Sequence, residues 1–160
     1  MEPDWHVAVE KGWELVNDEP KLIQYFMTLK NQNPESSRAH FELANALDFC
    51  GREAEAIPHY EEALRFDGLS HEVQAYTMVQ LGSSLRNVGR VEEAIDLLVK
   101  AEHDYPEHWA VSLFLALALY SAGRPADALK TAMRATLKHG RAEDLTRYRG
   151  VLTNYIDDIT

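Results

Sequence analysis

The sequence predicts an all-α fold, an α-solenoid in which antiparallel helix pairs stack on one another. The first observation is a seven-residue phrase that occurs three times, as GREAEAI at residues 51–57, GRVEEAI at residues 89–95 and GRPADAL at residues 123–129. The second is the spacing, since the glycines of the last two phrases are 34 residues apart. The third is that apolar residues recur at three- and four-residue steps on both sides of each phrase, which is the helical period. A repeat of this length is typical of stacked helical arrays.

Residues 3–36 are interpreted as a degenerate first repeat. Asn17, in the phrase NDEPKLI, lies 34 residues before Gly51, where the later repeats have glycine. Asparagine is the usual substitute for glycine at a left-handed helix end, so Asn17 is expected to end the first helix of this repeat. Glu10 stands where the later repeats have a small residue. The packing of this helix pair is therefore expected to differ from that of the others.

Three clear repeats follow, at residues 37–74, 75–108 and 109–140, each with one helix before the glycine and one after it. The step from Gly51 to Gly89 is 38 residues, so the first of the three contains four extra residues, which we place in the segment FDGLSHEVQ at residues 66–74. Pro58 lies inside the second helix of this repeat, where a proline removes a backbone hydrogen bond. We therefore expect either a kinked helix or a helix that begins late.

Residues 141–160 are expected to form a capping helix. The open end of a helical stack needs a cover that has one apolar and one polar face. In this tail the apolar residues recur on one helical stripe, whose members are Leu145, Tyr148, Leu152, Tyr155 and Ile159.

The composition is that of a soluble globular protein, with 46% hydrophobic and 26% charged residues. The net charge of −10 and the lack of a basic cluster argue against nucleic acid and anionic membranes as partners, because both attract positive charge. The longest apolar stretch, residues 109–122, is too short to span a bilayer, and the acidic start MEPDWHVAVEKGW is unlike a secretory signal. The single cysteine, Cys50, excludes an internal disulfide. These features together predict a cytoplasmic protein.

The sequence contains no motif for catalysis, for a metal or for a cofactor. Each repeated phrase has one glycine between two helices, which cannot form a loop that holds a nucleotide phosphate. The seven histidines follow no metal-ligand spacing, and no base is placed beside Cys50 or the Ser83–Ser84 pair. We therefore expect a protein that is not an enzyme and carries no cofactor. The alternative is an enzyme that uses scattered histidines, which requires several of them to meet in the folded chain.

The repeats resemble the tetratricopeptide repeat. Counted from Ser37, Ala75 and Trp109, each has a small residue at place 8, glycine at place 15 and alanine at places 20 and 27. The stretches ELANALDFCGREAEAIPHYEEAL and LGSSLRNVGRVEEAI also resemble a bacterial group of small tetratricopeptide proteins without assigned activity. The resemblance implies a right-handed solenoid that serves as a protein-binding scaffold.

In tetratricopeptide proteins the first helices of the repeats line a concave groove that binds peptides, and the resemblance places positions 2, 5, 6, 9 and 12 of each repeat in this groove. Some members hold a peptide carboxylate with Lys, Asn and Arg. Here only Asn45 is retained, so that clamp is not expected; the groove places also include Glu42, Asp48, Ala110 and Tyr120. The residues that we expect to contact a partner are Arg38, Phe41, Asn45, Tyr76, Val79, Gln80, Ser83, Arg86, Leu113, Phe114 and Leu117.

The sequence of the fourth repeat is compatible with more than one partner for its first helix. Its first helix contains AVSLFLALALY at residues 110–120 and is apolar nearly all round. Such a helix is normally buried, and the capping helix and the neighbouring pair would cover it. Alternatively, a helix or peptide of a partner protein docks against Leu113, Phe114 and Leu117. A homodimer that associates through this repeat and the capping helix is a further possibility.

Overall fold

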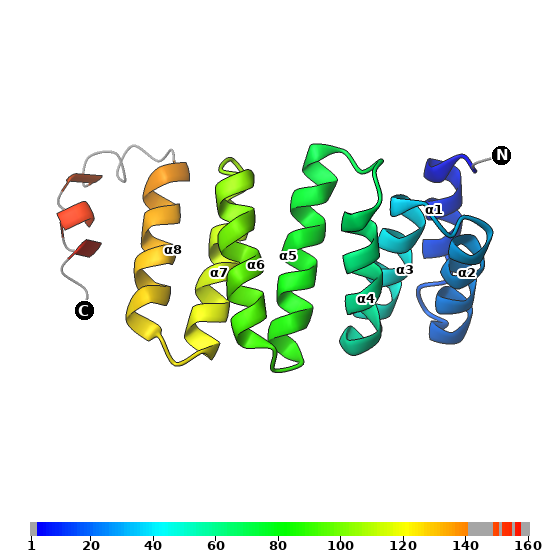
Figure 1. Cartoon of the computed structure of the whole chain (residues 1–160), viewed down its shortest axis with the longest axis horizontal. Helices are drawn as coiled ribbons and strands as arrows, with labels where there is room; N and C mark the ends of the chain where they lie inside the picture. Colours follow the sequence, from blue (N-terminus) through cyan, green and yellow to red (C-terminus); the bar gives the residue numbers. More distant parts are fainter. Residues whose placement is uncertain (1–2, 141–148, 151, 155, 158–160) are drawn as a thin grey trace. The chain divides into compact units, whose positions relative to one another are not determined.

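The computed structural model describes residues 3–140, 149–150, 152–154 and 156–157. Within this part of the chain the regular structure is helical, without strands, which confirms the all-α solenoid predicted from the sequence. Of these helices, none has the length and apolar character needed to cross a membrane. The helices, drawn in Figure 1, are α1 (Trp5–Trp13), α2 (Glu19–Gln32), α3 (Ser37–Phe49), α4 (Glu53–Arg65), α5 (His71–Asn87), α6 (Val91–Asp104), α7 (Trp109–Ser121) and α8 (Pro125–His139).

The chain divides within α5 into two compact units, residues 1–84 and 85–160, which we call the N-terminal and C-terminal units. In the N-terminal unit α1 packs against α2, α2 against α3, and α3 against α4 along its length. The core of this unit holds the fully buried side chains of Phe26, Leu43 and Tyr60. Ala44 and Ala56 are fully buried as well, and their small size lets neighbouring helices approach closely.

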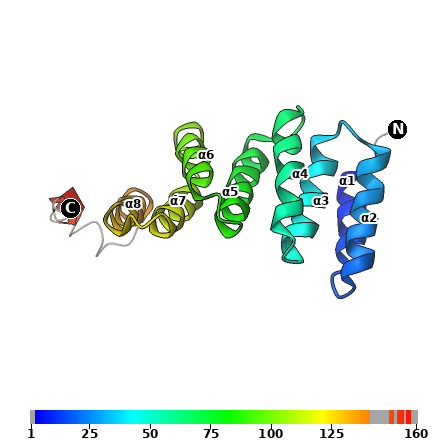
Figure 2. The same cartoon turned by 60° about the horizontal axis from the view of Figure 1, so that its bottom comes forward.

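In the C-terminal unit α6 packs against α7, and α7 packs against α8. Figure 2 shows α7 and α8 side by side, viewed nearly along their axes. Ala94, Ala101 and Ala135 are buried at the places where the repeat pattern predicts small residues. The same spacing of small residues therefore supports helix packing in both units.

The three repeated phrases are turns that end one helix and begin the next. Gly51, Gly89 and Gly123 have positive φ angles of 71°, 85° and 73°. In each turn the N–H after the glycine donates to a carbonyl five residues back, as Arg52 does to Leu47 at 2.9 Å. This is the Schellman arrangement, and glycine reaches its left-handed backbone without steric cost. The prediction that these glycines are joints between helices is confirmed.

The arginine after each glycine pairs with an acidic residue in the first turn of the next helix. The acidic side chain lies at the positive end of the helix dipole, and the pair joins residues that face the same side of that turn. The pairs are Arg52–Glu55, Arg90–Glu93 and Arg124–Asp127, with N–O distances of 2.7, 2.6 and 2.9 Å.

The first helix pair lacks the left-handed joint. Among the described residues a positive φ occurs only at glycines, so the prediction for Asn17 is wrong. Instead α1 ends at Trp13 and the chain continues through tight turns, with hydrogen bonds from Leu15 to Gly12 and from Val16 to Trp13. A connection of five residues, 14–18, is long enough to reverse the chain without a left-handed residue.

Close packing in the first pair depends on Gly12 rather than on residue 10. Gly12 is buried, and a Cβ atom there would lie 2.3 Å from the ring of Phe26. Glu10, at the place that is small in the later repeats, is exposed. The first pair thus achieves the close helix contact two positions further along α1.

The four extra residues of the second repeat lengthen a helix. α5 has 17 residues, whereas its counterparts α3 and α7 have 13 each. The added turn, residues 71–74, lies within the segment where the sequence places the insertion. Pro58 lies inside α4, which begins at Glu53 directly after the glycine turn. The expectation of a late helix start is therefore wrong, because a proline at the sixth helical position removes only one backbone bond.

Part of the predicted capping helix lies outside the described residues. In its described part Ile156 is 1% exposed, and Asp157 forms an ion pair with Arg134 of α8 at 2.7 Å. This segment therefore contacts the last helix of the C-terminal unit. The stripe residues that lie outside the described part are Leu145, Tyr148, Tyr155 and Ile159.

Replacing Gly89 by valine is expected to lower the melting temperature, because a β-branched residue would have to adopt a φ of 85°. The cost is ~1–2 kcal/mol. Apart from Gly89 and its two neighbours in the chain, no residue lies within 4 Å of the Cβ position, so the change tests mainly backbone strain. Gly89→Asn should lower the melting temperature less than Gly89→Val does, because asparagine tolerates a left-handed backbone. Thermal denaturation followed by circular dichroism measures both, and an unchanged melting temperature for Gly89→Val would contradict this account of the joint.

Candidate functional site

An open pocket of about 520 Å³ lies in the N-terminal unit, between α3 and α5 and beside the end of α1. It brings together five residues that the sequence predicts to contact a partner, and it adds Asp48, a predicted groove position. Two further aromatic residues complete the lining, which consists of Trp13, Phe41, Asn45, Asp48, Phe49, Tyr76, Val79 and Gln80.

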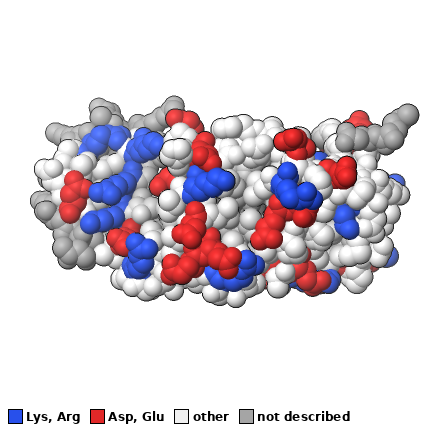
Figure 3. Space-filling model, in the orientation of Figure 1, with Lys and Arg blue, Asp and Glu red and all other residues white. Residues whose placement is uncertain are grey.

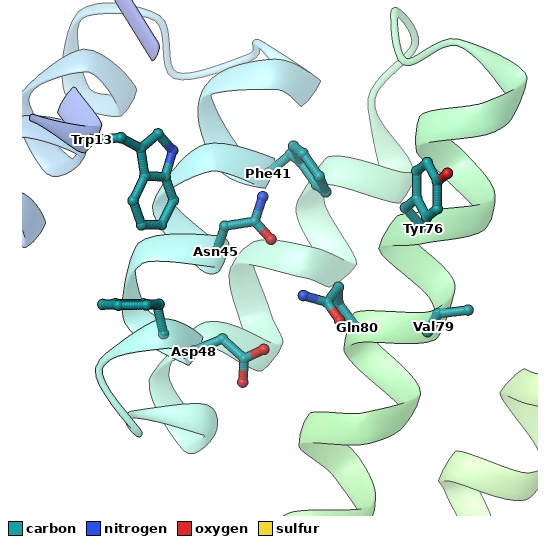
Figure 4. A pocket seen from close by; sticks show the side chains of 8 residues that line it. Trp13, Phe41, Asn45, Asp48, Tyr76, Val79 and Gln80 are labelled. Carbon is teal, nitrogen blue, oxygen red and sulfur yellow. The ribbon is translucent and has the colours of Figure 1, made fainter. Parts of the chain in front are cut away.

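Helical geometry explains why these side chains share one pocket. Phe41, Asn45 and Phe49 follow one another at steps of four along α3 and therefore lie on one face of that helix. Tyr76 and Gln80 have the same spacing on α5, the first helix of the next repeat. Figure 4 shows the side chains of both helices directed toward the same space, with Trp13 beside them.

Aromatic rings form much of the pocket wall. Trp13 and Phe49 pack edge to face, with ring centroids 5.6 Å apart, and Trp13 also packs against the buried Phe26 at 5.7 Å. Phe49 is 62% exposed and Tyr76 is 47% exposed, so both rings offer surface to a ligand. The Tyr76 hydroxyl donates to Glu72 at 3.3 Å, and Glu72 belongs to the added turn of α5.

Buried partners hold the polar side chains of the pocket. The hydroxyl of Tyr60, a fully buried residue of α4, donates to Asn45 Oδ1 at 2.9 Å and lies 3.4 Å from Asp48 Oδ2. The hydroxyl of Ser84, also fully buried, donates to Asp48 Oδ1 at 3.0 Å. Because Asn45 accepts through its oxygen, the N–H groups of its amide are left for the pocket. Figure 4 shows the polar ends of Asn45, Asp48 and Gln80 converging.

Burial raises the pKa of the Asp48 carboxyl above its ordinary value, and the negative charge of Glu53 acts in the same direction. The hydrogen bonds from Ser84 and Tyr60 oppose this change without cancelling it. The pKa of Tyr60 is also raised, first by burial and then by the charge of Asp48, so its phenol remains a donor. Within the described residues no basic side chain pairs with Asp48. The pocket therefore contains a carboxylate that only neutral groups contact.

Arg38 lies on α3 beside the pocket but does not line it. Its guanidinium pairs with Glu42 at 2.7 Å and lies 5.7 Å from the ring centroid of Phe41. Glu42 is 3% exposed and also receives a hydrogen bond from Trp13. Burial raises the pKa of Glu42, while the charge of Arg38 opposes that rise. Arg38 thus compensates a buried carboxylate and supports the side chain of Trp13 indirectly.

The other predicted contact residues do not line this pocket. Ser83 is half-buried on α5. Arg86, in the last turn of α5, contacts Asn87 at 2.9 Å and Ser121 at 3.4 Å. The remaining three lie on α7 in the C-terminal unit, where Leu113 and Phe114 are half-buried and Leu117 is 47% exposed.

Trp13 and Phe49 are site residues that the groove positions of the repeat do not include. Phe49 could have been found from the helical period, because it follows Phe41 and Asn45 at steps of four. Trp13 gives no comparable signal, since the first repeat departs from the pattern used to number the groove. Its place at the pocket depends on how α1 packs, which the sequence does not specify.

Two of the histidines meet in the folded chain, although they follow no metal-ligand spacing in the sequence. The Nδ1 atoms of His40 on α3 and His59 on α4 are 3.2 Å apart, because antiparallel packing brings together residues that are 19 positions apart. His40 Nε2 lies 3.0 Å from the carbonyl of Pro34, so Nε2 donates there and Nδ1 accepts from His59. Burial lowers the pKa of His59. The described residues contain no group of three or more side chains that could hold a metal ion, and the pair lies outside the pocket lining.

Helix pairs joined by glycine turns, with an open pocket on the first helices of neighbouring repeats, define a helical-repeat protein of the α-solenoid class. The sequence profile of the family described as Tetratrico peptide repeat matches residues 37–159. The chain belongs to this family, as its resemblance implies. A comparison with curated proteins finds no match.

Several solved structures have a similar fold. A crystal structure of MamA has 18% sequence identity and a TM-score of 0.68, over 87% of this chain and 78% of that one. YrrB, described as a TPR protein with an unusual peptide-binding site, has 14% identity and a TM-score of 0.68, over 87% and 69%. PilF of Pseudomonas aeruginosa has 20% identity and a TM-score of 0.69, over 96% and 69%. At these identities the likeness shows a shared fold.

The raised pKa of Asp48 makes its ionised form unfavourable for folding. A group whose pKa is higher in the folded state than in the unfolded state stabilises the fold most at a pH below its pKa in the unfolded state. This stabilisation is lost as the pH rises through the pKa of the folded state. Asp48→Asn keeps the size of the side chain and an acceptor for Ser84 but removes the charge. Its melting temperature should therefore exceed that of the wild type at pH 7, and the difference should shrink below about pH 4.

Thermal denaturation across this pH range measures the difference. Asp67→Asn is the control, because it removes the same charge from an exposed position of the same unit. A melting temperature of Asp48→Asn below that of the wild type at pH 7 would show that ionised Asp48 stabilises the fold.

Proposed function

We propose that this protein is a scaffold, not an enzyme, and that it binds a peptide segment of a partner protein in the pocket of the N-terminal unit. Tetratricopeptide repeat proteins are generally scaffolds for protein–protein interaction. One observation carries the proposal: exposed aromatic rings surround polar side chains whose orientations are set by buried partners. Ligand sites combine apolar surface with a few positioned polar groups in this way.

The amide side chains suit the backbone of an extended peptide. Each peptide unit carries one N–H donor and one carbonyl acceptor. Asn45 directs N–H groups into the pocket, and the amide of Gln80, which contacts the Tyr60 hydroxyl, lies opposite it on α5 (Figure 4). Together the two amides can donate hydrogen bonds to, and accept them from, one stretch of peptide main chain. YrrB, which shares the fold and is described as having a peptide-binding site, supports this interpretation.

A peptide selected from a display library against the purified protein tests the site. Its dissociation constant is measured by calorimetry for the wild type, Phe41→Ala and Asn45→Ala, with Leu117→Ala as the control outside the pocket. Removing an aromatic contact at the centre of an interface costs about 1–2 kcal/mol or more, so Phe41→Ala should weaken binding about tenfold. Leu117→Ala should leave the affinity unchanged. Binding that depends on Leu117 and is indifferent to Phe41 and Asn45 would place the site elsewhere.

A second candidate function is self-association through α7. It is supported by two large side chains on one face of α7, since Leu117 is 47% exposed and Tyr120 is 69% exposed. These two residues lie about one turn apart on that face. A homo-oligomer that buries them would remove apolar surface from water.

Light scattering at high micromolar concentration distinguishes this candidate from the first. A homodimer should have twice the mass of the chain, and Leu117→Glu should return it to a monomer by placing a charge in the interface. A wild-type protein that is monomeric at this concentration excludes self-association as the function.

A further inference from the structure

We infer that the pocket of the N-terminal unit recognises a cationic side chain of the bound peptide, an arginine or a lysine, through Asp48 and the surrounding aromatic rings. The inference rests on the proposed peptide-binding function and adds the chemistry of the ligand to it. Neither the glycine turns nor the groove positions of the repeat imply this preference.

Among the residues that the structure describes, no basic side chain pairs with the carboxylate of Asp48. Its oxygens lie 3.0 Å from the Ser84 hydroxyl and 3.4 Å from the Tyr60 hydroxyl, and both of these donors are neutral. Each carboxylate oxygen can accept a further hydrogen bond. Arg38, ten residues earlier on α3, is about 15 Å away along the helix and already pairs with Glu42. A cation brought by a ligand would therefore meet an unneutralised charge.

The aromatic lining suits a cation better than an anion. The faces of Trp, Tyr and Phe rings attract positive charge, and an arginine guanidinium also stacks on them. Two such contacts occur among the described residues, where Arg38 lies 5.7 Å from the ring centroid of Phe41 and Arg65 lies 4.2 Å from that of Phe66. In the pocket the ring of Phe49, which is 62% exposed, can make the same interaction.

The distribution of charge between the two units also favours a cationic ligand. Residues 1–84 contain 15 acidic and 6 basic side chains, a formal charge of −9, whereas residues 85–160 contain 11 and 10, a formal charge of −1. Nearly all of the net charge of the chain thus belongs to the unit that holds the pocket. On the face shown in Figure 3 acidic and basic side chains are intermixed. The negative electrostatic field of the N-terminal unit attracts a basic peptide, and Asp48 provides the local contact.

Other side chains fit the pocket less well. An acidic side chain or a C-terminal carboxylate would face Asp48 without any basic residue in the lining. An apolar side chain would exclude water from Asp48 and leave the carboxylate without compensation, which is unfavourable. A cation satisfies the carboxylate and the rings together, and its charge would lower the pKa that burial raises.

The test uses four acetylated and amidated pentapeptides, Ser-Ala-Xaa-Ala-Ser, in which Xaa is arginine, lysine, norleucine or glutamate. Nuclear magnetic resonance follows the indole N–H of Trp13 and the side-chain amides of Asn45 and Gln80 during each titration. The arginine or lysine peptide should bind about tenfold more tightly than the norleucine peptide, and the glutamate peptide should bind most weakly. Asp48→Asn should remove this preference, whereas Asp67→Asn, an exposed charge removed from the same unit, should retain it.

Equal affinities for the arginine, lysine and norleucine peptides, or a preference that survives Asp48→Asn, would overturn the inference. Either result would leave the pocket as a peptide site. If none of the four peptides shifts these signals while the display-selected peptide does, recognition of a cation is excluded and the proposed function stands. If the selected peptide also fails to shift them, both are overturned.

Discussion

The left-handed turn at each repeated glycine is the constraint on which the arrangement of this protein depends. It ends one helix and begins the next within three residues, so the second helix must run back along the first. The small residues at fixed distances from the glycine then set how closely the two helices pack. Because the turn recurs along the chain, equivalent positions of α3 and α5 line the same pocket within the N-terminal unit. Phe41 on α3 and Val79 on α5 share a pocket for this reason.

Tyr60 connects the core of the N-terminal unit to its site. Its ring is fully buried at place 24 of its repeat, and its hydroxyl holds Asn45 and contacts Asp48. At the same place the following repeats have Leu98 and Ala132, which carry no hydroxyl. A buried hydroxyl at this place can therefore hold polar side chains of the first helix in only one of the three clear repeats. One packing residue thus determines where polar side chains are held in fixed orientation.

The periodicity predicts the helices, the joints and most of the pocket, because these depend on local spacing. Five of the eight lining residues are among those expected to contact a partner, and Phe49 follows from the same helical step. Trp13 and the His40–His59 contact could not be predicted, since both depend on which faces of two separate helices meet. Asn17 and Gly12 illustrate the same limit. The degenerate repeat changes its connection length and shifts its close contact by two residues, and no local pattern in the sequence records either change.

The irregular features of the N-terminal unit meet at one place, and this convergence is the strongest argument that the pocket has a role. The degenerate repeat contributes Trp13, α4 contributes the hydroxyl of Tyr60, and the added turn of α5 contributes Glu72, which holds Tyr76. A regular stack needs none of these features for its stability. Asp48 even opposes stability at neutral pH, since burial raises its pKa and no cation compensates its charge within the described residues. Packing alone would favour a neutral side chain at that position, whereas a site that receives a positive charge from outside requires the carboxylate.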